Sequence, residues 1–150
     1  MALDMNPPAG TADFLAKLGW GEGDVLPLAG DASFRRYFRV ADHGRSAILM
    51  DAPPPHEDPR PFIEVAQWLV ARGFPAPAIF GTDLEQGLVL IEDFGDETFT
   101  RALDSGADPD ALYALAVDAM AALQGHPAAG SVAAPRHDAS GCCRLPTVVR

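Results

Sequence analysis

Hydrophobic positions along the chain predict an alternation of helices and strands. Apolar residues at helical spacing between helix-starting and helix-ending residues predict helices, whereas short apolar or alternating runs between turn residues predict strands. The predicted helices cover residues 11–18, 58–73 and 108–125, and the predicted strands cover residues 25–29, 34–40, 46–50, 79–83 and 88–91. After a lead-in helix, the order is therefore three antiparallel strands, a helix, two strands and a longer helix.

Single residues sharpen this prediction. Gly19 stands where a left-handed residue ends the first helix, and Pro27 makes residues 25–29 typical of an edge strand. The uninterrupted apolar run at 88–91 is typical of a buried central strand. Period-two spacing gives residues 34–40 two faces, with Phe34, Arg36, Phe38 and Val40 on one and Arg35, Tyr37 and Arg39 on the other. The second face is thus basic and aromatic.

Composition excludes several classes of function. The chain has 150 residues, 11 of them basic and 21 acidic, and a formal net charge of -10, which argues against general nucleic-acid binding and attachment to anionic membranes. No apolar run has the length of a membrane span and the N-terminus lacks a signal-peptide pattern, so we expect a soluble cytoplasmic protein. Cys142 and Cys143 are adjacent, which argues against a disulfide framework or a zinc site.

Three segments carry a resemblance to a known family. They are LAGDASFRRYFRV at 28–40, ILMDAPP at 48–54 and LIEDFGD at 90–96. In this order they resemble the aminoglycoside phosphotransferase family, and within it the anomeric kinases that phosphorylate N-acetylmuramate and N-acetylglucosamine in cell-wall recycling. The resemblance covers about residues 11–127. It implies an α+β fold, in which a protein-kinase-like N-terminal lobe with a five-stranded antiparallel sheet and one helix precedes the first helix of a C-terminal lobe.

The resemblance also implies a nucleotide site. The loop over the ATP phosphates, where small residues let main-chain N–H groups approach oxygen atoms, would consist of Gly30, Asp31, Ala32, Ser33, Phe34 and Arg35. The connector between the lobes would bring the main chain at Glu92, Asp93 and Phe94 to the edge of the adenine. Spacing alone favours an ordinary hairpin turn for the first segment and leaves a solvated strand end as the alternative for the second.

The positive charge that would meet the phosphates has no obvious source. Kinase-like folds pair a strand lysine with a helix carboxylate. Glu64 lies near the place of that carboxylate, but Met50 stands where the lysine is expected. The only lysine is Lys17, and Leu18 after it excludes a Walker-type phosphate loop. Candidates to replace the lysine, with ordinary surface charge as the alternative, are Arg35, Arg36 and Arg39.

The residues of phosphoryl transfer are not recognisable in this chain. The superfamily uses an aspartate, an asparagine five residues later and a further aspartate that holds magnesium. The only asparagine is Asn6, and the segments that begin at His56 and His137 lack asparagine at the required position. We therefore assign neither a catalytic residue nor a magnesium ligand to this chain.

These expectations divide the chain into four segments. Residues 1–24 form a lead-in helix, 25–96 the kinase-like small lobe, 97–127 the connector and the first helix of the large lobe, and 128–150 an irregular tail. The change of composition near Gly130 prompts the hypothesis that the tail arises from a frameshift and that the chain is a truncated kinase.

Two functions follow as hypotheses. The first is an ATP-dependent sugar kinase that uses ATP and magnesium, present here as an inactive nucleotide-binding fragment, with a sugar acceptor bound only in a full-length relative. The alternative is a non-catalytic module that docks onto another chain through its last helix and the bare surface of its sheet. Neither hypothesis involves a nucleic acid or a membrane.

Overall fold

The computed structural model describes residues 6–28 and 34–126 of the chain. In chain order its elements are α1 (Thr11–Lys17), β1 (Asp24–Pro27), β2 (Arg36–Asp42), β3 (Arg45–Asp51), α2 (Arg60–Val70), β4 (Ile79–Asp83), β5 (Leu88–Glu92), α3 (Phe99–Asp104) and α4 (Pro109–Gln124). Within these residues no helix combines the length and the apolar character that a membrane span requires.

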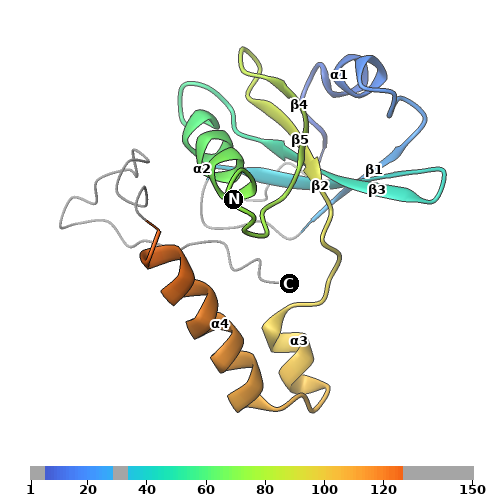
Figure 1. Cartoon of the computed structure of the whole chain (residues 1–150). Helices are drawn as coiled ribbons and strands as arrows, with labels where there is room; N and C mark the ends of the chain where they lie inside the picture. The colour runs from blue at the N-terminus through green and yellow to red at the C-terminus, as the bar shows by residue number, and fades with distance from the viewer. Residues whose placement is uncertain (1–5, 29–33, 127–150) are drawn as a thin grey trace.

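One antiparallel sheet organises the structure (Figure 1). Its five strands lie in the order β1-β2-β3-β5-β4, and every neighbouring pair is antiparallel. The predicted α+β class with a five-stranded antiparallel sheet is confirmed, as is the position of β1 at an edge. β5 has a neighbour on each side, and four of its five residues are buried, as its apolar sequence predicts.

Two local predictions are wrong. Strand β2 begins at Arg36 rather than at residue 34, so Phe34 lies outside the strand, and 65% of its surface is exposed. Phe38 and Val40, which the alternation places on one face, are both buried. Helix α3 was not predicted, because its six residues are too few to show a helical period; Thr98 caps it by accepting a hydrogen bond from the N–H of Arg101.

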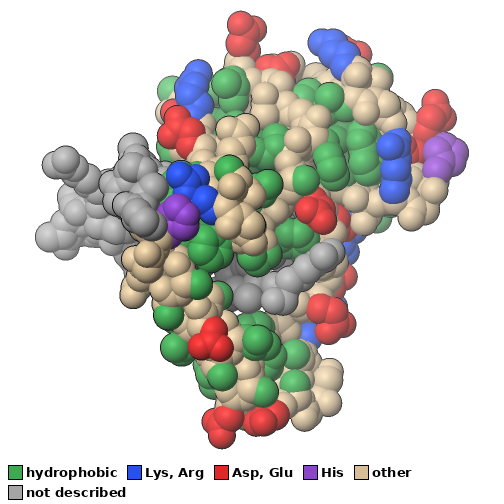
Figure 2. Space-filling view, in the orientation of Figure 1, with side chains coloured by type: hydrophobic (Ala, Val, Ile, Leu, Met, Phe, Trp, Pro, Cys, Tyr) green, Lys and Arg blue, Asp and Glu red, His purple; other side chains and the backbone are tan. Residues whose placement is uncertain are grey.

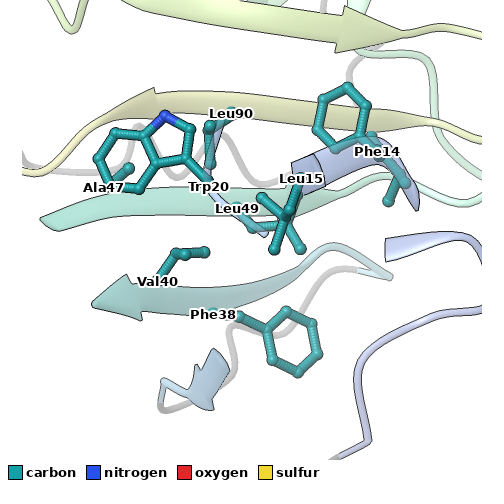
Figure 3. Close-up of a cluster of buried hydrophobic side chains, with 9 residues drawn as sticks. Phe14, Leu15, Trp20, Phe38, Val40, Ala47, Leu49 and Leu90 are labelled. Atoms are coloured by element: carbon teal, nitrogen blue, oxygen red, sulfur yellow. The ribbon is translucent and has the colours of Figure 1, made fainter. Parts of the chain in front are cut away.

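The two faces of the sheet carry separate hydrophobic clusters. On one face, α1 and the following Trp20 pack on β2, β3 and β5 (Figure 3), in a cluster of Phe14, Leu15, Trp20, Phe38, Val40, Ala47, Leu49, Leu88 and Leu90. On the other face, α2 packs on the sheet, in a cluster of Met50, Val89 and Ile91 with the partly buried Tyr37, Ile48, Phe62, Ile63 and Ile79. We call this second side the α2 face.

Helices α3 and α4 extend away from the sheet beyond the connector that leaves β5 (Figure 1). None of their residues is buried, and Figure 2 shows hydrophobic side chains on the outside of this part of the molecule. Large exposed apolar side chains on α4 are Tyr113, Leu115, Val117 and Met120. At its far end α4 returns to α2, where the His126 ring meets the edge of Trp68 at 5.5 Å between centroids.

A close main-chain approach joins the end of β3 to the start of β5. The N–H of Ala52 donates to the carbonyl of Gly87 at 2.8 Å. Gly87 has φ +74°, and a Cβ there would lie 2.0 Å from the carbonyl oxygen of Ala52. Only glycine fits this position, because any side chain would require the two strands to separate.

We predict that Gly87→Ala lowers the free energy of unfolding by about 2 to 5 kcal/mol, because left-handed strain adds to the clash with the backbone. The matched control is Gly44→Ala: Gly44 has φ +83° with no atom within 4 Å of the added Cβ, and should lose only about 1 to 2 kcal/mol. Urea denaturation of both variants measures the difference. Equal losses would show that the approach of Ala52 to Gly87 is not tight in solution.

Candidate nucleotide site

The candidate loop and the candidate connector leave the sheet at opposite ends. Residues that pair across neighbouring strands form a row of the sheet. Arg36, just after the loop, is in one row with Asp51 on β3 and Leu88 on β5, whereas Glu92 on β5 is in a row with Ala47 on β3. These rows are four residues apart on β3 and on β5, so they are separated by about 13 Å along the strands. The part of the α2 face between these two rows carries Met50 and Ile48 of β3.

The loop is described only at its C-terminal end, since Gly30, Asp31, Ala32 and Ser33 lie outside the described residues. Phe34 stacks on the ring of His56 with 5.1 Å between centroids. The Nε of Arg35 donates to Oε2 of Glu57 at 3.0 Å. Both contacts reach the segment between β3 and α2, so this segment anchors the end of the loop.

Arg36 binds a buried carboxylate on the neighbouring strand. Its Nη2 lies 2.6 Å from Oδ2 of Asp51, its Nε donates to the same oxygen at 2.8 Å, and the Asp51 side chain is 2% exposed. Arg36 also donates to the carbonyl of Asn6 at 3.2 Å, and its guanidinium lies 5.7 Å from the centroid of the Phe38 ring. Arg36 thus shares a face with Phe38, as predicted, and its positive charge compensates the buried carboxylate of Asp51.

Arg39 binds two carboxylates of the connector. Its Nε lies 2.8 Å from Oδ2 of Asp93, and its Nη2 donates to Oδ1 of Asp96 at 2.9 Å. The three arginines that were hypothesised to meet phosphate therefore each have a carboxylate partner. Their role toward phosphate stays a hypothesis.

Hydrogen bonds shift the ionisation of these carboxyl groups. Burial alone would raise the pKa of Asp93, but hydrogen bonds from the Gly95 N–H, the Ser46 side chain and Arg39 outweigh burial and lower it. The hydrogen bond from Arg39, with its positive charge, lowers the pKa of Asp96, and these two aspartates in turn raise the pKa of Arg39. The group is therefore fully ionised at neutral pH.

The connector begins with a main-chain anchor. The N–H of Glu92 donates to the carbonyl of Ala78 at 2.8 Å, and Oε2 of Glu92 accepts from the N–H of Ala78 at 3.2 Å. The side chains of Glu92 and Asp93 thus both hold the connector to the sheet, while Phe94 is half-buried. A contact of the main chain at residues 92–94 with adenine stays a prediction.

Met50 and Glu64 lie on the elements that the resemblance requires. Met50 is fully buried on the α2 face, beside Val89 and Ile91. Glu64 is exposed on α2 and makes no ion pair within residues 6–28 and 34–126. Lys17 is on α1, which packs against the opposite face of the sheet. Glu64 therefore has no strand lysine to pair with, and Met50 packs among apolar side chains.

Sequence reasoning missed the acidic partners of the arginines. Asp51, Glu57 and Asp96 were not candidates, because the pattern of the sequence does not show which arginine each of them meets in the folded chain. In the described part of the chain, no three His, Cys, Asp or Glu side chains come together in a group that could hold a metal ion.

The comparison with family models decides the family. Residues 24–141 match the phosphotransferase enzyme family, which is more than half of the chain. The chain belongs to this family. The match includes all five strands, the connector and both later helices, and the family expected from the three segments is confirmed.

Individual relatives match most of the chain. An N-acetylmuramate/N-acetylglucosamine kinase of Pseudomonas aeruginosa is 46% identical over 109 residues, which are 71% of this chain and 32% of the relative. Kinases of the same name from Pseudomonas putida and Caulobacter vibrioides are 38% and 32% identical, covering 75% and 85% of this chain and 34% and 42% of the relatives. The chain thus spans about a third of the length of the first of these relatives.

We predict that Met50→Lys lowers the free energy of unfolding by several kcal/mol, because the ammonium group would be buried without a carboxylate partner. Met50→Leu should lose less than about 1.5 kcal/mol. Met120→Lys is the matched control, because Met120 is 55% exposed on α4, and should change stability by no more than about 0.5 kcal/mol. Equal unfolding curves in urea for Met50→Lys and Met50→Leu would show that a lysine at this position reaches a partner.

We also predict that Asp93→Asn lowers the free energy of unfolding by about 1 to 3 kcal/mol at pH 7, because it removes charge-assisted hydrogen bonds. Since the folded pKa of Asp93 is depressed, this stabilisation is complete above the unfolded pKa of about 3.9 and is lost as the pH falls through the folded pKa. Urea denaturation from pH 7 to pH 2.5 should therefore show the gap between wild type and variant closing only below about pH 4. A gap that stays constant over this range would contradict a role for the charge.

Proposed function

We propose that this chain is the nucleotide-binding part of an ATP-dependent kinase whose acceptor is an amino sugar, N-acetylmuramate or N-acetylglucosamine. The observation that carries the proposal is the match of this chain to kinases of that name, at 32% to 46% identity over 71% to 85% of its length. The comparisons give no support to the alternative, a docking module without catalysis. As a kinase that uses ATP, the protein would act in the cytoplasm.

In this proposal the nucleotide lies along the strands on the α2 face. The main chain at residues 92–94 meets the adenine edge, and the main-chain N–H groups of residues 30–33 meet the phosphates. The separation of about 13 Å between the two ends of the sheet supports this arrangement, because an extended nucleoside triphosphate can span it.

Magnesium is implied by the family, but the described residues do not fit it. No suitable group of oxygen ligands occurs in residues 6–28 or 34–126. The only asparagine, Asn6, uses its main-chain carbonyl to accept from Arg36 and precedes the sheet. We therefore derive no catalytic step for this chain, and we expect it to bind nucleotide without turnover.

Mg-ATP should stabilise the chain by mass action. The expected gain is about 2.7 kcal/mol when the nucleotide concentration is one hundred times the dissociation constant, because ligand binds only the folded state. Thermal unfolding at increasing Mg-ATP measures the gain. An unchanged unfolding temperature up to millimolar Mg-ATP would overturn the proposal.

A negative charge introduced into the loop tests where the phosphates bind. Ser33→Asp should weaken Mg-ATP binding by roughly tenfold, because it places a carboxylate beside the triphosphate. Ser105→Asp makes the same change at an exposed residue that ends α3, and should leave the affinity unaltered. Equal affinities of the two variants would place the phosphates elsewhere.

A further inference from the structure

Arg39 joins the second strand of the sheet to the connector through both sides of its guanidinium. On one side Nε lies 2.8 Å from Oδ2 of Asp93 and Nη2 donates to Oδ1 of Asp93 at 3.2 Å. On the other side Nη1 and Nη2 donate to the two oxygens of Asp96 at 3.1 and 2.9 Å. One side chain thus holds two points of the connector that lie 54 and 57 residues further along the chain.

The two carboxylates contribute differently. The Asp93 side chain is 4% exposed, whereas Asp96 is 52% exposed, so water and salt weaken the contact to Asp96 much more. Asp93 also accepts from the N–H of Gly95 at 2.8 Å and from the Ser46 side chain. Asp93 therefore shapes the turn of the connector at Gly95, and Arg39 fixes Asp93 to the sheet.

The position of Arg39 separates it from the phosphate end of the proposed site. Arg39 lies in the row of the sheet with Ile48 and Ile91, adjacent to the row of Glu92 where the connector starts. Arg36, at the loop end, is three residues away, which is about 10 Å along the strand. The guanidinium is also already paired with two carboxylates, so it has no uncompensated positive charge to offer a phosphate.

We propose that Arg39 is a positioning residue for adenine: by holding Asp93 and Asp96, it orients the main chain at residues 92–94 toward the edge of the base. This inference rests on the function proposed above. It assigns Arg39 an indirect effect on the affinity for the base and no contact with the phosphates. The alternative that the sequence suggested, a phosphate ligand, predicts the opposite pattern of affinities.

The test compares three ligands on the 150-residue chain: Mg-ATP, Mg-GTP and magnesium tripolyphosphate. GTP carries a different pattern of donors and acceptors on the base edge, and tripolyphosphate has no base at all. We expect the wild type to prefer ATP to GTP. In Arg39→Gln, the affinity for ATP should fall by roughly tenfold, the equivalent of one or two misaligned main-chain hydrogen bonds. The affinities for GTP and tripolyphosphate should change by less than about twofold.

Arg45→Gln is the matched control. Arg45 also binds a buried aspartate, Asp42, at 2.5 Å, but its guanidinium covers the ring of Trp20 at 3.9 Å, on the side of the sheet that packs against α1. This variant should lose stability and retain the preference for ATP. Titration calorimetry is performed at a temperature where circular dichroism shows every variant folded. If Arg39→Gln does not fold, Arg39→Lys replaces it, and should show a smaller loss confined to ATP.

The possible failures are distinguishable. A wild type that binds no nucleotide overturns the proposed function and this inference together. A wild type that binds ATP and GTP equally leaves the proposed function intact and overturns the inference, because the connector then does not recognise the base. An equal loss for ATP, GTP and tripolyphosphate in the Arg39 variant also overturns it, and favours a phosphate ligand.

Discussion

The two-residue turn at His43 and Gly44 sets the register of the β2–β3 hairpin, and both faces of the sheet depend on that register. Both residues have positive φ, 48° and 83°, which matches the tight turn that suits the twist of a hairpin. The turn pairs Asp42 with Arg45 and, at the far end of the same hairpin, Arg36 with Asp51. A slip of one residue would exchange the two faces, which would expose Phe38 and Val40 and separate Arg36 from the carboxylate that neutralises it. The hydrophobic pattern and the ion pair therefore favour the same register.

From this hairpin the arginines of one short segment organise the rest of the candidate site. Arg35 reaches the segment before α2, Arg36 the end of β3, and Arg39 the connector after β5. Because Asp51 and Asp93 have side chains that are almost fully buried, each needs its arginine to offset the loss of hydration. The three segments that resemble the family are thus in direct contact with one another in the folded chain. In this chain the three segments therefore hold the small sheet and the connector together.

The sequence allowed the strands, the main helices and the buried faces to be predicted, because these depend on local periodicity. The buried side chains of Phe38, Val40 and β5 follow from alternation and from an uninterrupted apolar run. The prediction that Phe34 belongs to the second strand was wrong, because β2 starts only where its pairing with β3 starts, at Arg36. The pair of Arg36 with Asp51 could have been predicted from a turn placed at His43 and Gly44. The contact of Arg39 with Asp93 could not, because it depends on the pairing of β3 with β5, which are separated by a helix and a strand.

The same contacts constrain how this chain would meet the charge of a triphosphate. Its net charge is -10, its only lysine lies on α1, and its three candidate arginines already bind carboxylates. Recruiting Arg36 to a phosphate would leave Asp51 buried and ionised without its partner, at a cost of about 3 to 5 kcal/mol. Arg35 is less constrained, because both it and Glu57 are partly exposed and their ion pair contributes little. Of the three arginines, Arg35 is therefore the one whose transfer to a phosphate would cost the sheet least.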